Sequence, residues 1–553
     1  MASSRAKKQG LARRYPALLF LLAAGALAIL LPSALNVPQS GPTTLAEFAP
    51  VPGQGDGRSD VSDLGSAVSG GIGFGSGSGG KLAPPPSSVG KPDQASRRLK
   101  RCVGQPPRQT EDPLSPPCVA FFDGDNFGST ARGVTRDQAS VLARMTNTDP
   151  ATDRDAGRVF SCADLPSTND QFQDVLCKAY WRYFNDRYQT YGRLVQLWSI
   201  HNPYAAANLD QQYKPFAAVD IGQSGNWAPR KILSVSYVGS SRSSYLKDAP
   251  HVVSFRADSE DQSAMAASFV CGKLAGRRAQ FAGDDTLAGR QRKFGFLYAA
   301  PGHTPRKEAM RAYFRDNCGF DVTEETSDWQ TQQGMVKLRG ADVTSVILLV
   351  DNIATATNYA TQLAYFPEWI IVGATDSNGI DNNFQARTAN PVQWANSFGV
   401  TYDYRRDALK TQAWYRAYRE GCSTPECPEP AAGMRGVQFG AAIYDSMNML
   451  FYGIQAAGPR LTAENIDKGL HAIPARGSDD PYRPAAYFAP GNYSFIKDAM
   501  AIWWDPTGQP PDSQSRGCYR LPHEGRRFRP AEWIGGDDDI QMQGPCQADT
   551  FVG

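Results

Sequence analysis

The sequence predicts an α/β protein of two doubly wound, Rossmann-like lobes, preceded by a membrane segment and a flexible linker. Segments with the patterns of strands and helices alternate from about Gly133 onward, and such alternation is typical of doubly wound sheets. The stretch Val343–Val350 is almost wholly apolar, as in a strand that is buried on both faces of a parallel sheet. About 420 residues follow the linker, which is too many for one sheet, so we expect two lobes.

Residues 1–35 are predicted to be a signal sequence or a membrane anchor. Five basic residues and no acidic residue precede an apolar run from Ala17 to Leu31. The segment Tyr15–Leu35 approaches the roughly 20 residues that a helix needs to span a bilayer, and its basic flank favours the inside. Cleavage after Ala34 would put Pro32 where a small residue is expected. We therefore expect an uncleaved anchor, and a cleaved signal that would leave the protein secreted stays the alternative.

Residues 36–101 are predicted to form a flexible linker. Eleven glycines and six serines lie between residues 51 and 80, a composition that buries too little apolar surface to fold. The run Gly75–Lys81 is similar to a phosphate-binding loop, but Leu82 replaces the magnesium-binding serine or threonine, and no strand precedes it.

The stretch Asp123–Gly128 raises the question of a calcium site, because aspartates and glycine are spaced as in an EF-hand loop. Phe127 stands where the fifth position needs an oxygen ligand, and Val134 where a glutamate must close the shell. We expect instead a turn-rich loop that leads into the first strand.

The first lobe is predicted from alternating periodicities that begin with a helix over Asp170–Tyr191, which Gly192 ends. A helix from Ser259 to Leu274 should begin with a capping box of Ser259 and Gln262. The strands that we expect in this lobe lie at residues 194–197, 216–221 and 232–237.

The second lobe is predicted to begin with a strand at Phe294–Tyr298 and a helix that starts at Thr304-Pro305 and stops at Gly319. Further elements of this lobe are a helix at 354–365 and a strand at 369–373, and a helix is also expected at 438–457, beyond this lobe. Trp503 and Trp504 are adjacent in a strand, so their side chains should point to opposite faces.

Composition and cysteine count limit the partners. Fifty-seven basic residues nearly balance 55 acidic ones, so no overall field favours nucleic acid. The ten cysteines all follow residue 101, and their even number suits disulfides outside the cytoplasm. No CxxC pair supports a zinc site. Connectivity stays open, and the simplest pairing joins neighbours in the sequence, such as Cys162–Cys177, Cys271–Cys318, Cys422–Cys427 and Cys518–Cys546.

An ordered series of segments resembles the type I periplasmic solute-binding proteins, in the branch that binds branched-chain amino acids and amides for ABC importers. The likeness spans roughly residues 130 to 525, and no single motif in it is diagnostic. The segments are Gly133–Thr135, Lys231–Ser236, His251–Arg256, Phe294–Tyr298, Phe366–Trp369, Ile443–Ser446 and Gln455–Pro459. The resemblance implies two lobes joined by hinges, with lobe one at residues 102–280 and 400–490 and lobe two at 281–399 and 491–553. The chain departs from the family in an insertion, Ala143–Thr168, and in its carboxyl-terminal tail.

Ligand-binding candidates follow from the ends of the predicted strands, where such sheets leave a crevice. Hydroxyl and backbone N–H groups there would hold a carboxylate, and an acid, for which Asp376 is the best candidate, would hold an amine. Serine, asparagine and aspartate at these places can instead cap helices. The candidates are Gln223, Ser224, Tyr237, Ser240 and Ser241 in lobe one, and Tyr298, Asp351, Asn352, Thr375, Asp376 and Ser377 in lobe two.

The function that we expect is extracytoplasmic capture of a small polar solute for separate ABC permease and ATPase subunits. An anchored sensor or receptor ectodomain with the same lobes is the alternative. We expect no enzyme, cofactor or metal, because the sequence has neither a GxSxG nor an HExxH motif. The acidic run Asp537–Asp539 is interpreted as solvated.

Overall fold

The computed structural model describes residues 102–549, except 105–106, 120–121, 145–158, 166–171, 201–205, 221–226, 237–238, 351, 374–385, 387, 404, 423–426, 431–439, 476–479 and 534. The predicted membrane segment and linker lie outside the described residues. Within the described part of the chain, no helix is both long and apolar enough to cross a bilayer.

The first sheet has six strands in the order β2-β3-β1-β4-β5-β6. All neighbouring strands are parallel except β2, which is antiparallel to β3. The parallel strands thus follow the order second, first, third, fourth, fifth, which is one of the two common doubly wound orders. The strands are β1 (Gln138–Arg144), β2 (Val159–Ser161), β3 (Leu194–Ile200), β4 (Ala217–Asp220), β5 (Leu233–Ser236) and β6 (Val252–Ser254).

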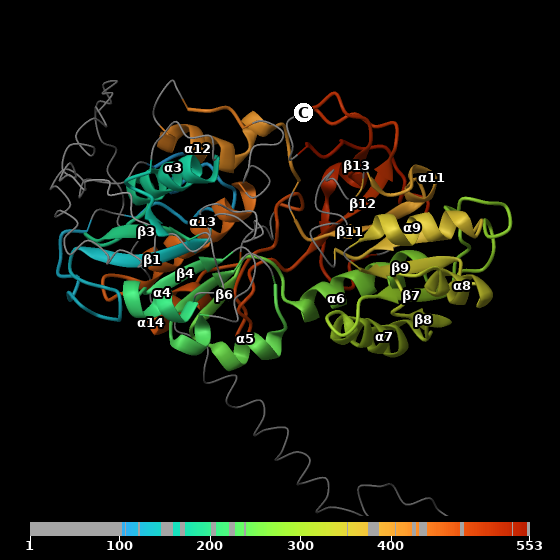
Figure 1. Cartoon of the computed structure of the whole chain (residues 1–553), viewed down its shortest axis with the longest axis horizontal. Helices are drawn as coiled ribbons and strands as arrows, with labels where there is room; N and C mark the ends of the chain where they lie inside the picture. The colour runs from blue at the N-terminus through green and yellow to red at the C-terminus, as the bar shows by residue number, and fades with distance from the viewer. Residues whose placement is uncertain are drawn as a thin grey trace, which may run out of the picture. The chain divides into compact units, whose positions relative to one another are not determined.

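Helices cover this first sheet because each buries an apolar stripe against it. One face carries α3 (Phe172–Arg187), α12 (Ala413–Cys422) and α13 (Gly440–Ala457), and α3 and α12 lie side by side (Figure 1). The opposite face packs against α4 (Ala206–Tyr213) through Leu209 and Tyr213. The remaining helices are α5 (Arg242–Asp248), α14 (Ala463–His471), which packs on α13, and a 3-10 turn at Ala228–Arg230.

The second sheet runs β13-β12-β11-β10-β9-β7-β8, and β14 pairs with β12. Strands β8, β7, β9, β10 and β11 are parallel and repeat the order of the first sheet, whereas β12, β13 and β14 pair antiparallel. The strands are β7 (Phe294–Tyr298), β8 (Glu324–Thr326), β9 (Ser345–Leu349), β10 (Glu368–Ile371), β11 (Ser397–Thr401), β12 (Ala499–Asp505), β13 (Cys518–Arg520) and β14 (Arg527–Phe528).

Two separate cores lie on the faces of the second sheet. Helices α6 (Ser259–Phe269) and α7 (Thr304–Cys318) pack on one face, and a π-helical turn, Val270–Leu274, extends α6. Helices α8 (Gln332–Gly340), α9 (Ile353–Gln362) and α11 (Pro391–Trp394) pack on the other. Trp503 belongs to the first of these cores and Trp504 to the second, so the prediction of opposite faces is confirmed. Short 3-10 helices lie at Leu409–Thr411 and Pro522–Gly525.

The chain passes between the core of the first sheet and the cores of the second at three places, which we call the crossings. Phe255 packs in the first core and Ala257 in the second. The return lies between Tyr402 and Leu409, and the last crossing lies just after Ile496. The core of each sheet is therefore built from segments that are not contiguous in the chain.

Five disulfides join cysteines that are neighbours in the sequence. The four pairs expected from the sequence are all present, and Cys102–Cys118 is the fifth. Cys271–Cys318 joins the turn after α6 to the end of α7. Cys518–Cys546 ties the carboxyl-terminal tail to β13.

Two local predictions were wrong. Helix α3 ends at Arg187 rather than Tyr191, because Gln189 and Thr190 form hydrogen bonds outside the helix. Helix α6 is capped by Asp258, whose carboxylate accepts from the backbone N–H of Asp261 at 2.7 Å. Ser259 is the first helical residue, so it forms no capping box.

Candidate functional site

The carboxyl ends of the parallel strands are the places where a doubly wound sheet can hold a ligand. The strand order reverses between β1 and β4 in the first sheet and between β7 and β9 in the second. At such reversals the following helices leave on opposite faces and open a crevice at the carboxyl edge. Described residues at these carboxyl edges follow β5 in the first sheet and β7, β9, β10 and β11 in the second.

Four of the candidates chosen from the sequence lie in the described residues, namely Ser240, Ser241, Tyr298 and Asn352. The first two follow β5, whereas Tyr298 and Asn352 come from β7 and from the segment after β9, which are neighbouring strands. The other seven lie outside the described residues, and they are Gln223, Ser224, Tyr237, Asp351, Thr375, Asp376 and Ser377.

Two of the described candidates cap helices. The Ser241 hydroxyl accepts from the backbone N–H of Ser244 at 3.2 Å and begins α5. The Asn352 carbonyl oxygen accepts from the N–H of Thr355, also at 3.2 Å, and begins α9. The backbone N–H of Ser240 donates to the Tyr245 hydroxyl at 2.6 Å. These groups fix where two helices start at the carboxyl edges.

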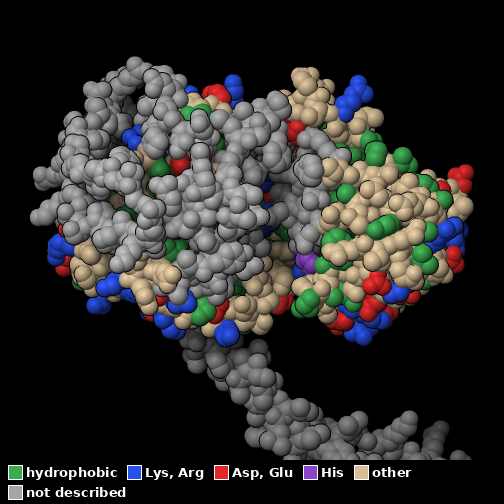
Figure 2. Space-filling model, viewed as in Figure 1, with side chains coloured by type: hydrophobic (Ala, Val, Ile, Leu, Met, Phe, Trp, Pro, Cys, Tyr) green, Lys and Arg blue, Asp and Glu red, His purple; other side chains and the backbone are tan. Residues whose placement is uncertain are grey.

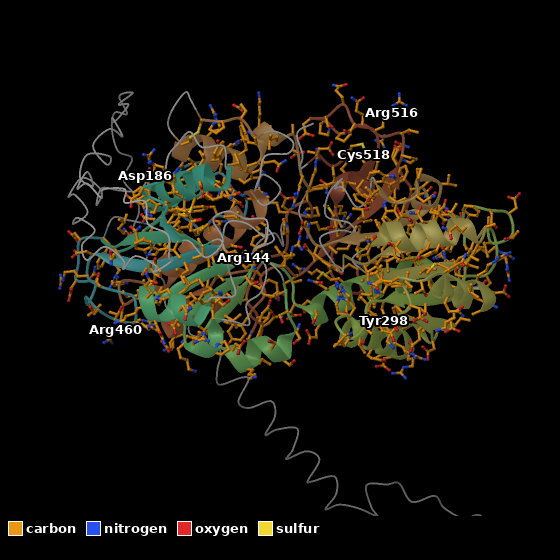
Figure 3. All side chains as sticks on the ribbon, in the orientation of Figure 1. Arg144, Asp186, Tyr298, Arg460, Arg516 and Cys518 are labelled. Atoms are coloured by element: carbon orange, nitrogen blue, oxygen red, sulfur yellow. A yellow bond between two sulfur atoms is a disulfide. The ribbon has the colours of Figure 1, made fainter. Side chains whose placement is uncertain are left out.

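Tyr298 is the last residue of β7, and the ammonium of Lys307 lies 4.8 Å from the centre of its ring. Figure 3 labels Tyr298 beside α7. Lys307 also pairs with Glu308 at 2.7 Å and with Glu325 at 2.9 Å. In Figure 2, basic (blue) and acidic (red) side chains lie together at the lower right, where Figure 1 places α7. The charge of Lys307 is therefore balanced within the protein.

Arg306, one residue earlier in the first turn of α7, has a different environment. Its side chain is only 6% exposed, and its Nη2 donates to the backbone carbonyl of Val372, just past β10, at 3.3 Å. Its Nε has no hydrogen-bond partner, and no described carboxylate lies within ion-pair distance of it. Burial lowers the pKa of Arg306, although the neighbouring Tyr402 acts in the opposite direction.

Tyr402 completes this corner of the second sheet. It follows β11 directly, and its hydroxyl lies in hydrogen-bond distance of the carbonyl oxygens of Val372 and, at 3.0 Å, Gln262. Burial raises the pKa of Tyr402 to about 12, so it is neutral near pH 7. Gly373 packs under its ring with φ +57°, and a Cβ there would lie 2.5 Å from the ring. Only glycine fits this place without strain.

We define Arg306, Val372, Gly373 and Tyr402 as the arginine corner. It gathers the ends of β10 and β11 around the first turn of α7. The sequence interpretation missed it, because it considered only residues that directly follow strands. One signal was available: a helix amino terminus favours acidic side chains, yet the first turn of α7 has no acidic residue and places Arg306 there.

At the amino edge of the same sheet, a buried arginine is paired with carboxylates. Arg292, just before β7, forms a two-pronged pair with Glu368, at 2.8 and 2.9 Å, and its Nη1 lies 2.7 Å from Asp537. Burial by itself would lower the pKa of Arg292, but the two carboxylates outweigh it and raise that pKa. Asp539 pairs with Lys273 at 2.9 Å. The interpretation of Asp537–Asp539 as a solvated run was therefore wrong, because the tail folds back onto buried cations.

Charged side chains also link the crossings. Asp261, in the first turn of α6, accepts from Lys497 at 2.8 Å and from Asn492 at 2.9 Å. Arg256 pairs with Asp403 at 3.1 Å. Burial by itself would raise the pKa of Asp261, but Lys497 and the other donors lower it below its ordinary value. Each crossing is thereby joined to another by an ion pair.

The loop Asp123–Gly128 is held by hydrogen bonds within the protein. The Asn126 amide donates to the carbonyls of Arg136 at 2.7 Å and Tyr191 at 2.9 Å, and Asp125 pairs with Arg136 at 3.2 Å. Arg193 donates to the carbonyls of Asn126 and Gly128. In the described residues, no group of three or more histidine, cysteine, aspartate or glutamate side chains is arranged to hold a metal ion.

Comparisons with known proteins give structural neighbours only. No protein-family model and no curated protein matches the chain. The solved structures found are type I periplasmic solute-binding proteins of ABC transporters, the class that the sequence resembles.

Three of these structures illustrate the likeness. A Rhodopseudomonas palustris solute-binding protein in complex with 4-hydroxybenzoate is 11% identical, with a TM-score of 0.46, and covers 74% of this chain and 100% of its own. A fatty-acid ABC transporter substrate-binding protein from Thermomonospora curvata is 14% identical, with a TM-score of 0.48, and covers 74% and 96%. A leucine-, isoleucine-, valine-, threonine- and alanine-binding protein from Brucella ovis is 9% identical, with a TM-score of 0.47, and covers 74% and 100%.

Proposed function

We propose that the chain is an extracytoplasmic solute-binding protein that captures a small polar solute between two lobes and delivers it to an ABC importer. The observation that carries this proposal is the repeated strand order, second-first-third-fourth-fifth, in two sheets that three crossings connect. Each sheet of this order offers a ligand crevice at its carboxyl edge, and two such edges on hinged lobes can enclose one small molecule. Permease and ATPase subunits would be the partners.

The core packing supports lobe boundaries at the crossings. We propose that lobe one gives way to lobe two near residue 256, that the chain returns near residue 405, and that it crosses again near residue 497. These places differ from the boundaries at 280, 400 and 490 that the sequence resemblance implied. The crossings, with their ion pairs, would then be the hinges.

The disulfides support the extracytoplasmic part of the proposal. Five disulfides bring together all ten cysteines of the chain, and such bridges persist outside the cytoplasm. We keep the membrane anchor at residues 15–35 as a further proposal. Protease protection of intact cells that express the full-length chain tests both, because the lobes should be accessible from outside while the first residues stay protected.

Ligand-dependent stabilisation tests solute capture. Full-length protein in mild detergent would be heated with amino acids, amides, polyamines and aromatic acids, one at a time. A solute that binds only the folded form raises the Tm saturably, by an amount that follows its concentration over its Kd. Small-angle scattering with that solute should then show compaction as the lobes close. A panel without any saturable rise, together with unchanged scattering, would contradict solute capture.

A further inference from the structure

We propose that the solute is an anion, in the first place a carboxylate, and that the guanidinium of Arg306 in the arginine corner binds it. This inference rests on the proposed function and specifies its solute. It assigns a ligand contact to a side chain of the second sheet that does not directly follow a strand.

The first argument is that no carboxylate of the described residues balances the charge of Arg306. An arginine stays protonated in proteins, and an isolated buried charge is so unfavourable that buried charges are normally paired. Arg306 is 94% buried by its 6% exposure, yet among the described residues it has one backbone carbonyl as acceptor and the neutral Tyr402 beside it. Neither group carries the negative charge that would balance it.

The second argument is the contrast with the other buried cations of the same sheet. Arg292 has Glu368 and Asp537, Lys307 has Glu308 and Glu325, and Lys273 has Asp539. The sheet thus provides internal carboxylates wherever a cation is buried for stability. At the arginine corner the described residues provide none, and an anion from outside would complete the pair.

The third argument is the location of Arg306. It lies in the first turn of the 15-residue helix α7, where unpaired backbone N–H groups and the helix dipole favour an anion. The corner also lies at the carboxyl ends of β10 and β11, the edge where doubly wound sheets hold ligands. A cation beside a helix amino terminus is unfavourable by itself, and a bound anion would offset both positive potentials.

The fourth argument is the chemistry of the free donors. The Nε of Arg306 is buried without an acceptor, and an arginine fork matches the two oxygens of a carboxylate in one plane. A purely structural role would need only the hydrogen bond to Val372, which a neutral amide could form as well. The arrangement therefore fits a carboxylate better than an amine or a neutral solute.

The test uses pairs of solutes that differ only in charge. Full-length protein in mild detergent is titrated with benzoate and benzamide, hexanoate and hexanamide, leucine and leucinamide, and with putrescine as a cation. Wild type, Arg306→Met, Arg306→Lys and the control Arg292→Met are compared, because Arg292 is equally buried but lies at the amino edge. The readouts are the Tm shift and, for any solute that shifts it, the Kd by calorimetry.

We expect at least one carboxylate to raise the Tm saturably and its neutral partner to do so weakly. Arg306→Met should weaken that carboxylate by roughly 100-fold, and Arg306→Lys by less, because the charge stays but the fork is lost. Arg292→Met should lower the Tm of the free protein and leave the Kd of the folded fraction unchanged. Arg306→Met should leave the free protein's Tm unchanged or raise it, because it removes an unbalanced buried charge.

Four results would overturn the inference. Equal binding of acid and amide, or an undiminished affinity in Arg306→Met, would refute the anion site but leave solute capture intact. A free-protein Tm that falls as far in Arg306→Met as in Arg292→Met would assign Arg306 a structural role. Failure of every solute to shift the wild-type Tm would count against both the anion site and the proposed function.

Discussion

Arg292 and Arg306 lie on either side of β7, each followed by a lysine and each 6% exposed, but their surroundings differ in charge. Glu368 and Asp537 surround Arg292 at the amino edge of the second sheet, whereas Arg306 at the carboxyl edge has no described carboxylate partner. The pKa of Arg292 is raised and that of Arg306 is lowered. Among the described residues, carboxylates therefore balance the charge of the arginine at the amino edge, and none balances the charge of the arginine at the carboxyl edge.

Lys497 at the crossings is the intermediate case. It is largely buried and has one carboxylate partner, Asp261, at 2.8 Å. Burial lowers the pKa of Lys497, and Asp261 opposes that change. In the described part of the chain, Arg292 therefore has two carboxylate partners, Lys497 has one and Arg306 has none. Substituting the carboxylate partners of Arg292 should therefore lower the free energy of unfolding more than substituting the partner of Lys497.

The largest effect should come from the amino edge. Glu368→Gln removes the two-pronged partner of Arg292 and leaves that buried guanidinium with Asp537 alone, so we expect a loss of about 3 kcal/mol in unfolding free energy. Urea unfolding followed by circular dichroism measures it. The control is Asp342→Asn, which breaks exposed pairs with Arg290 and Lys293 and should cost less than about 1 kcal/mol. Equal losses of unfolding free energy in Glu368→Gln and Asp342→Asn would show that the buried pair of Arg292 contributes no more than an exposed pair.

A smaller loss, about 2 kcal/mol, is expected for Asp261→Asn at the crossings, because its ion pairs with Lys497 and Arg242 are broken and Asp261 stays partly exposed. The pKa of Asp261 is lowered, so its contribution is present above the ordinary aspartate pKa of about 4 and is lost as the pH falls through the folded value. Unfolding free energies from pH 6 to pH 3 should therefore converge for wild type and variant at the acidic end. A difference that stays constant with pH would show that the charge of Asp261 is not what stabilises the crossing.

Within the arginine corner, Gly373→Ala should cost about 1–2 kcal/mol, because the φ of +57° is strained for alanine and the new methyl group meets the Tyr402 ring. Tryptophan and tyrosine fluorescence during urea unfolding gives the midpoint. Gly319→Ala is the matched control, since Gly319 has a φ of +68° but nothing within 4 Å of a Cβ. If both variants lose the same stability, the close packing of Gly373 against Tyr402 contributes nothing.

The smallest effect concerns Tyr402 itself. Tyr402→Phe removes a buried hydroxyl that bonds backbone carbonyls, and we expect a loss of about 1 kcal/mol. Because burial raises the pKa of Tyr402 to about 12, its contribution is complete below the ordinary tyrosine pKa of about 10 and is lost as the pH rises toward 12. The difference between wild type and variant in phenolate absorbance should show one tyrosine that ionises near pH 12. Ionisation near pH 10 would mean that Tyr402 is not buried against Arg306.

Local patterns in the sequence were sufficient for much of the fold. Thr304-Pro305 and Gly319 predicted the limits of α7, and the apolar run Val343–Val350 predicted β9. Helix ends and buried strands depend mainly on residues that are adjacent in the sequence. Cysteines close in the sequence formed the disulfides, since short loops bring such pairs together readily. Boundaries failed where distant groups intervened, as at the end of α3, where Gln455 binds the backbone of Gln189.

The sequence by itself determined that two doubly wound sheets would form. It could not determine which of the two arginines on either side of β7 would have carboxylate partners among the described residues. The partners of Arg292 lie 76 and 245 residues away along the chain, and only folding brings them to the amino edge. The same folding places Arg306 beside the carbonyl of Val372 and the neutral Tyr402, because charge balance is a property of positions in space and not of neighbours in the chain.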